Sequence, residues 1–177
     1  MIDGFNLGSP FRMDLEQLAR KSSSDHPDSE KKLTFLVEEG IAQQAINLLP
    51  FFQHIIIKCG DQGVLVAMYI SPKDTFKSGW ANLRSNPRER YILARGKSDE
   101  LVVLQHFPSL PVEKLANVTG AGDSFAGALL ATLAHNPDAL YHPRSLREAV
   151  ILSQQAAVLT LQSHSAVSPG LSELGKH

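Results

Sequence analysis

The sequence predicts an α/β protein in which helices flank a mainly parallel sheet. Runs rich in β-branched residues at 54–59, 64–70 and 100–107 have the length and continuity of buried strands. Segments with apolar residues at helical spacing alternate with these runs. The chain has 177 residues, of which 43% are hydrophobic, so it is long enough to bury the core that such a fold requires.

The first expected elements are a loop and a helix. Residues 20–34 are charged and rich in serine, which is typical of a flexible loop. A helix is expected over 34–49, because Leu36, Ile41 and Ala45 can share one helical face and Pro50 then stops it.

The strands follow this helix. The first expected strand is HIIIKC at 54–59. The residues GDQG then form a turn, and VLVAMYI at 64–70 is the second expected strand. Residues 71–99 carry prolines and alternating charges, so a second flexible loop is expected there. The run ELVVLQHF at 100–107 resumes the pattern of a strand.

Two helices complete the expected single domain over 1–177. They are predicted from Ser124 to about His135 and from about Ser145 to Leu161, and two prolines lie between them. Ligands of parallel α/β sheets bind at the carboxyl ends of the strands, where loops lead into helices.

The composition argues against several classes of partner and of site. The formal net charge is −1, from 17 basic and 18 acidic residues, which argues against a nucleic-acid partner. The only cysteine, Cys59, cannot form an internal disulfide, which fits a cytoplasmic location, and its apolar surroundings favour a buried hydrophobe over a catalytic thiol. No apolar run reaches the roughly 20 residues of a membrane span, so no membrane partner is expected. The seven histidines lack the spacing of a helical zinc site and are expected at surface or packing positions.

The stretch NVTGAGDSFAGALL at 117–130 contains the strongest site candidate. Its apolar periodicity places a helix start at Asp123 or Ser124, so Gly120, Ala121 and Gly122 form the turn before that helix. Small residues let a ligand approach the main chain, and the unpaired N–H groups of a first helical turn attract anions.

Asp123 itself has two interpretations. Aspartate is a favoured helix cap, and the helix dipole stabilises it there. Alternatively, Asp123 is a general base beside a bound phosphate and takes a proton from an attacking hydroxyl. Spacing alone leaves both open.

The residues GAGD before a helix of small residues resemble the D-T-x-G-A-G-D pattern of the ribokinase-like carbohydrate kinases. The resemblance implies that Asp123 is the catalytic base for a hydroxyl that attacks the γ-phosphate of ATP. It implies that the amides of Gly120, Ala121 and Gly122 bind the transferring group, with Mg²⁺ shielding the phosphates.

Further segments are similar to that family in the same order. KCGDQG, from Lys58 through Gly60 to Gly63, resembles a strand-end turn that lines the nucleotide site, and Gln154 lies where a helix borders the adenine pocket. SAVSP at 165–169 is similar to a loop that binds a monovalent cation such as K⁺, for which the resemblance offers three residues. These are Asn117, Thr119 and Ser168.

Within the family, the stretch 117–130 with HFPSLPVEKL before it is most similar to the pseudouridine kinases. The resemblance then implies phosphorylation of the 5′-hydroxyl of a nucleoside. It spans about residues 35–170, so the chain is expected to be the C-terminal, nucleotide-binding part of such a kinase, truncated on the N-terminal side.

The sequence also departs from the family. Its N-x-x-E element, which helps to position Mg²⁺, is not found, and Asn117 and Val118 replace the commoner acid and hydroxyl. A truncated sheet exposes an edge, so a homodimer is a further expectation. Two alternatives to an active kinase stay open: a non-catalytic isoform that binds nucleotide or a partner chain, and another phosphate-binding protein in which Asp123 only caps.

Overall fold

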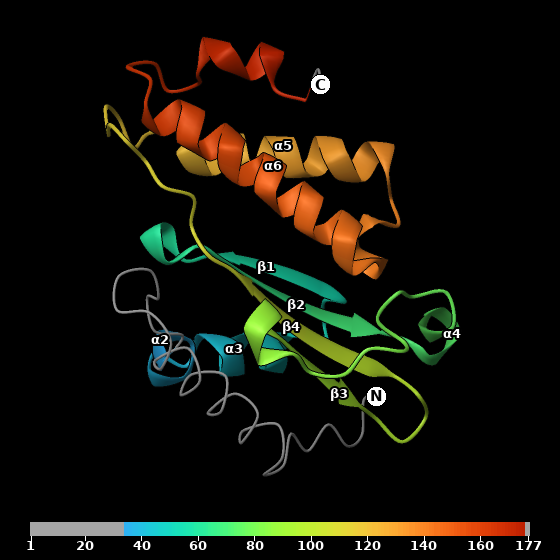
Figure 1. The fold of residues 1–177 in the computed structure, drawn as a ribbon. Helices are drawn as coiled ribbons and strands as arrows, with labels where there is room; N and C mark the ends of the chain where they lie inside the picture. Colours follow the sequence, from blue (N-terminus) through green and yellow to red (C-terminus); the bar gives the residue numbers. More distant parts are fainter. Residues whose placement is uncertain (1–33, 176–177) are drawn as a thin grey trace. The chain divides into compact units, whose positions relative to one another are not determined.

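A computed structural model describes residues 34–175 of the chain (Figure 1). The chain divides into two compact units, the first ending at Phe107 and the second beginning at Pro108. The single domain expected over 1–177 stays a prediction. The loop expected at 20–34 lies, apart from Thr34, outside the described residues.

A four-stranded antiparallel sheet with the order β1-β2-β4-β3 forms the first unit. Its strands are β1 (His54–Lys58), β2 (Val64–Ile70), β3 (Tyr91–Arg95) and β4 (Leu101–Phe107). Every neighbouring pair is antiparallel, so the prediction of a mainly parallel sheet is wrong. The reason is the short link between β1 and β2: a parallel pair needs a crossover of about a dozen residues or more.

The register places the turn after β1 beside the end of β4. Lys58 pairs with Val64, and along β2 the next residue, Leu65, pairs with His106 of β4. Side chains alternate between the two faces of a strand, so His106 lies on the same face as Val102 and Leu104.

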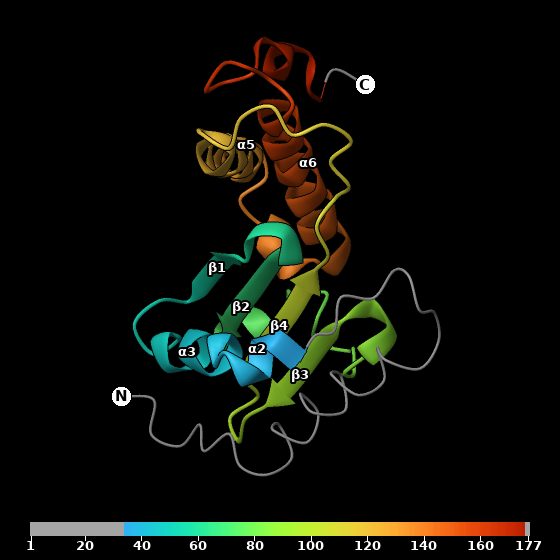
Figure 2. The same cartoon turned by 90° about the vertical axis from the view of Figure 1, so that its left-hand side faces the viewer.

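Two short helices cover this face, α2 (Thr34–Glu38) and α3 (Ile41–Leu48) (Figure 2). They were expected as one helix over 34–49. Gly40 separates them, because its φ of 69° lies in the left-handed region, which ends a right-handed helix. The apolar face of these helices packs with the sheet in one core cluster. It includes Leu36, Ala45, Ile46, Leu65, Ala67 and Leu104.

The segment 71–99, expected as a loop, contributes regular structure. It contains the helix α4 (Pro72–Thr75), a 3₁₀ turn η2 (Pro87–Glu89) and the edge strand β3. Trp80 is fully buried and meets the ring of Tyr91 edge-on, with ring centroids 5.5 Å apart. A buried aromatic pair anchors the segment to the sheet.

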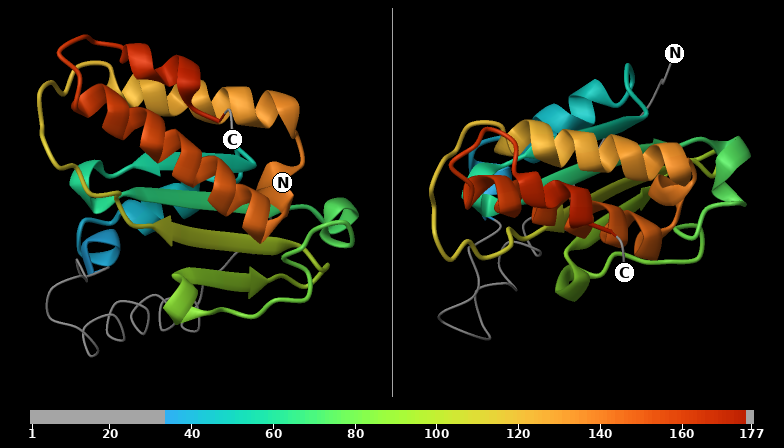
Figure 3. Two further views of the ribbon diagram at one scale, coloured as in Figure 1. Left: turned by 45° about the horizontal axis from the view of Figure 1, so that its top comes forward. Right: turned by 90° about the horizontal axis from the view of Figure 1, so that it is seen from above.

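The second unit consists mainly of two packed helices, α5 (Ala121–His135) and α6 (Pro143–Leu161), which lie side by side in both views of Figure 3. A 3₁₀ turn η3 (Ala139–Tyr141) connects them, and η4 (Pro169–Glu173) follows α6. Both helices were predicted. The helix α5 begins three residues earlier than expected, at Ala121. The helix α6 begins two residues earlier, with Pro143 at its first position, where the fixed φ of proline suits a helix.

Candidate active site

The helix-start turn, Gly120–Gly122, leads into α5. Gly120 is the N-cap with φ 79°, and its carbonyl accepts the first helical bond, from the Ser124 N–H at 2.8 Å. Among the described residues, the N–H groups of residues 120–123 bind no acceptor. These free amides at the positive end of a 15-residue helix can bind an anion.

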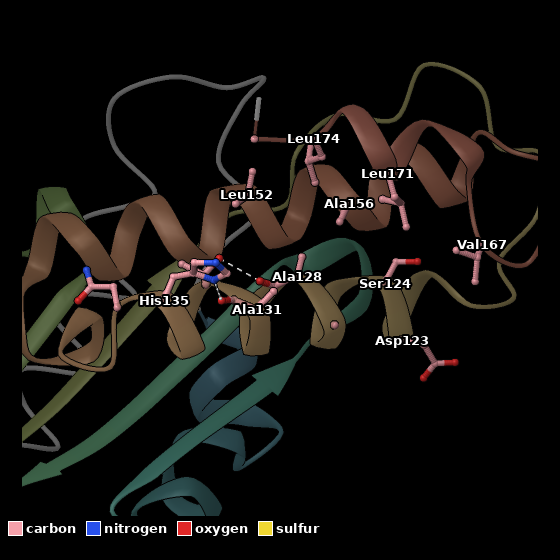
Figure 4. A pocket seen from close by; sticks show the side chains of 14 residues that line it. Asp123, Ser124, Ala128, Ala131, His135, Leu152, Ala156, Val167, Leu171 and Leu174 are labelled. Atoms are coloured by element: carbon pink, nitrogen blue, oxygen red, sulfur yellow. Dashed lines mark hydrogen bonds between the residues drawn. The ribbon is translucent and has the colours of Figure 1, made fainter. Parts of the chain in front are cut away.

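Asp123 is the third residue of α5 and not its cap, so the interpretation of Asp123 as the N-cap is wrong. Its carboxylate is exposed and has no hydrogen-bond or ion-pair partner among residues 34–175. In Figure 4 the side chain points away from the neighbouring lining residues. A carboxylate without a partner in the fold can accept a proton from an incoming group.

Gly120 could not be replaced by a larger residue without a shift of the backbone. A Cβ atom added to Gly120 would overlap the carbonyl oxygen of Ala166, which belongs to the segment after α6. The positive φ independently disfavours any side chain there. The SAVSP segment at 165–169 and the GAGD stretch, far apart in sequence, therefore meet in the second unit.

Hydrogen bonds of buried hydroxyl groups connect the start of α5 to α6 and to the SAVSP segment. Ser124 Oγ and Thr160 Oγ1, on α5 and α6, share a hydrogen bond of 2.7 Å, and the Ser168 N–H donates to Thr160 Oγ1 at 3.4 Å. Thr160 is fully buried. Since buried hydroxyl groups without partners are costly, this network fixes the start of α5 against the end of α6.

The three residues proposed for a monovalent cation carry other hydrogen bonds. Asn117 Oδ1 accepts from the Thr119 N–H at 2.9 Å, and Ser168 Oγ accepts from the Gly170 N–H at 3.2 Å as the N-cap of η4. The N–H groups of Ala116 and Asn117 both donate to the Leu161 carbonyl. These oxygens retain lone pairs for K⁺, and the cation site stays a prediction.

A groove of about 690 Å³ runs along the same unit (Figure 4). Its floor is a row of small side chains on α5, and α6 and η4 supply apolar walls. Its lining includes Gly127, Ala128, Ala131, Leu152, Ala156 and Leu171. Asp123 and Ser124 lie at the end of the groove next to the helix-start turn.

The strand turn, Cys59–Gly63, lies in the first unit and includes two of the residues proposed to line a nucleotide. Gly60 and Gly63 have φ values of 58° and 97°, and the Cys59 N–H closes the turn by donating to the Gly63 carbonyl at 2.7 Å. Lys58 is exposed at the end of β1. A Cβ on Gly60 would meet no described atom within 4 Å, so space beside this turn is open.

Cys59 is half-buried, and burial raises the pKa of its thiol. A raised pKa keeps the thiol protonated and weakens it as a nucleophile. The thiol lies against the core cluster, consistent with a packing role.

Gln154, expected beside the adenine, is buried in α6 at 6% exposure. Its Oε1 accepts from the Leu110 N–H at 3.1 Å, which ties the segment before the GAGD stretch to the helix. Its Nε2 has no partner among the described residues. Gln154 does not line the groove described above, and its contact with a nucleotide stays a prediction.

The described residues do not supply a magnesium site. Mg²⁺ prefers clustered carboxylate and other oxygen ligands, and within residues 34–175 no group of three or more His, Cys, Asp or Glu side chains gathers. In the same part of the chain no helix has the length and apolar character needed to cross a bilayer.

A glycine turn with free amides, followed by an unpartnered acid in the first turn of a helix, is a candidate anion-binding site in an α/β protein. Residues 89–173, which include this turn, match the profile of the pfkB family carbohydrate kinases. This segment, just under half of the chain, is therefore similar to that family.

Two individual proteins are similar to longer parts of the chain. A pseudouridine-metabolizing bifunctional protein of Schizosaccharomyces pombe is 26% identical over 176 residues, which is 99% of this chain and 20% of that protein. The solved structure of ribokinase from Giardia lamblia matches 86% of this chain and 36% of its own, at 15% identity and a TM-score of 0.42. The chain thus spans about a fifth of the curated relative and about a third of the solved one.

Sequence reasoning missed the residues that support the two turns. It did not assign roles to Arg90, Ser124, Thr160 or Ala166, and it placed His106 among ordinary packing histidines. The sequence held one usable signal: Gln105 and His106 interrupt an otherwise apolar strand, and a polar residue in a buried strand needs a partner.

Proposed function

We propose that this chain is the catalytic-base portion of an ATP-dependent kinase that phosphorylates a hydroxyl group of a sugar or nucleoside. One observation carries the proposal: the exposed, unpartnered carboxylate of Asp123 adjoins four free backbone N–H groups at the start of α5. A base for the attacking alcohol and donors for the transferring phosphoryl group are what such a reaction needs.

In the proposed reaction the Asp123 carboxylate takes the proton of the acceptor hydroxyl. The hydroxyl oxygen forms a bond to the γ-phosphorus of ATP while the bond to the bridging β–γ oxygen breaks, and ADP leaves. The amides of Gly120, Ala121 and Gly122 hold the negative oxygens of the transferring group. Pseudouridine is the proposed acceptor, supported by the name of the 26% identical Schizosaccharomyces pombe protein.

Phosphate transfer from ATP to pseudouridine, ribose and adenosine tests the proposal. Asp123→Asn removes the base and keeps the size of the side chain, so transfer should fall about 10²- to 10⁴-fold. The free energy of unfolding should change by about 1 kcal/mol or less, because only an exposed charge near the helix dipole is lost.

Asp138→Asn is the matched control, because Asp138 is also exposed but lies in the connection between α5 and α6. It should leave transfer unchanged. Wild-type protein that binds ADP in titration calorimetry but transfers no phosphate would identify the non-catalytic alternative. Protein that binds no nucleotide at millimolar concentration would refute the proposed function.

A further inference from the structure

His106 of β4 makes two directed side-chain contacts in the first unit. Its Nε2 lies 2.7 Å from the carbonyl oxygen of Gln62, and its Nδ1 lies 3.4 Å from Nη1 of Arg90. A carbonyl can only accept, so Nε2 carries the ring proton, and Nδ1 then accepts from the guanidinium. These contacts fix the ring as one neutral tautomer.

The surroundings hold this ring in place. His106 is 4% exposed, and Phe35 of α2 meets it edge-on with centroids 5.8 Å apart. The Arg90 carbonyl also accepts the His106 backbone N–H at 2.9 Å. Arg90 has a φ of 58°, which is unusual for a residue with a side chain, and bonds on both its carbonyl and its guanidinium offset that cost.

Gln62 belongs to the strand turn, so His106 acts on the shape of that turn. The Gln62 N–H donates to the Cys59 carbonyl, and the Gly63 N–H donates to the Gly60 carbonyl. A carbonyl and the following N–H share one planar peptide group. Holding the Gln62 oxygen therefore also fixes the direction of the Gly63 N–H.

We propose that His106 is a positioning residue for the strand turn: through its Nε2–H bond to the Gln62 carbonyl, and held by Arg90, it keeps the Gly60–Gly63 backbone in the shape that receives the nucleotide. The nucleotide role rests on the proposed function. His106 is 4% exposed and contacts the turn from the core side of the sheet, so the role assigned to it is to position the turn and not to bind substrate.

Two substitutions separate this role from ordinary core packing. His106→Gln keeps an amide N–H near the position of Nε2, whereas His106→Leu fills the space without a donor. Ile92→Val is the control, because Ile92 lies in the same core cluster on β3 and contributes only apolar packing there.

The first measurement is hydrogen exchange of the backbone amides at 59–64 in the protein without ligand. His106→Leu should raise their exchange about tenfold, the effect of one lost hydrogen bond. In His106→Gln and Ile92→Val, the exchange rates of these amides should stay within about threefold of the wild-type rates. Equal exchange at these amides in His106→Leu and Ile92→Val would overturn the positioning role.

The second measurement is ADP affinity by titration calorimetry, with the Michaelis constant for ATP and kcat alongside. His106→Leu should weaken ADP binding about tenfold and raise the Michaelis constant for ATP, while kcat stays near the wild-type value. Unchanged ADP affinity in His106→Leu would overturn the link to nucleotide binding. If wild type binds no ADP, the proposed function and that link fail together, while the exchange data still decide whether His106 positions the turn.

Discussion

The two glycine turns use the same residue type for different reasons. At the strand turn, Gly60 has a positive φ but open space where a side chain would lie. At the helix-start turn, Gly120 has a positive φ, and the backbone carbonyl of Ala166 occupies the space that a side chain would need. The first glycine is needed for its conformation alone, and the second for its conformation and its lack of volume.

The supports of the turns also differ. A side chain, His106, holds the strand turn through one carbonyl, whereas backbone and buried hydroxyl groups from the end of α6 hold the helix-start turn. Glycine residues in a motif therefore permit several backbone conformations. Contacts with residues elsewhere in the chain then stabilise one of them.

Alanine substitutions sharpen this difference the most. Gly120→Ala should destabilise the protein by about 4 kcal/mol, the sum of the left-handed backbone cost and the displacement of the Ala166 carbonyl. Gly60→Ala should cost only about 1 kcal/mol, for its backbone alone. Urea unfolding followed by circular dichroism measures both.

Gly127→Ala is the control for these changes. Gly127 lies inside α5 with no described atom near its added Cβ, so alanine should stabilise the helix by about 0.5–1 kcal/mol. Equal losses for Gly120→Ala and Gly60→Ala would show that the close approach of Ala166 does not matter.

The next largest expected effect is a loss of folded stability at low pH, caused by protonation of His106, the residue that supports the strand turn. Burial of the His106 ring, together with the nearby Arg90 charge, lowers its pKa to about 4, against the opposing effect of its bond to Gln62. The unfolded chain binds the proton at its ordinary pKa, near 6.5, so folded stability is full above pH 6.5 and falls as the pH drops towards 4. The loss should reach about 3 kcal/mol.

Unfolding free energies of wild type and His106→Gln across pH 4–7 measure this contribution, because the effects of the carboxylates cancel in the difference. The wild type should lose stability more steeply than the variant between pH 6.5 and 4. Parallel curves would mean that the His106 ring titrates normally in the folded protein.

The smallest effect is expected at the buried hydroxyl pair behind the helix-start turn. Ser124→Ala leaves the Thr160 hydroxyl with one partner fewer, and Thr160→Val leaves the Ser124 hydroxyl buried alone, so each should cost about 1–2 kcal/mol. The double variant should cost less than the sum of the two, as for residues in contact. Additive losses in a thermal unfolding series would contradict a direct bond.

The sequence predicted the existence of most elements, because strand and helix periodicities are local. The runs at 54–58, 64–70 and 101–107 are strands as expected. Strand direction was missed, although a short glycine-containing turn between two apolar runs is a hairpin signal. Strand β3 was missed because its five residues, YILAR, are short and lie between charged segments, with a proline shortly before them.

The helix-start turn could be predicted because its residues are contiguous and its amides follow from helix geometry. Its assignment as a catalytic site stays a prediction. The contact of Ala166 with Gly120 could not be foreseen, since it depends on how the chain returns after α6. The same holds for His106, whose partner Gln62 is set by strand register and not by local pattern.

The carbonyl over Gly120 also bears on the order of events during synthesis. A ribosome-bound chain that ends with α6 already contains the complete GAGD sequence but lacks the segment that closes over it. Such a nascent chain can form the helix before its first turn has a defined shape. The first turn of α5 therefore acquires its defined shape only after the residues that follow α6 have emerged.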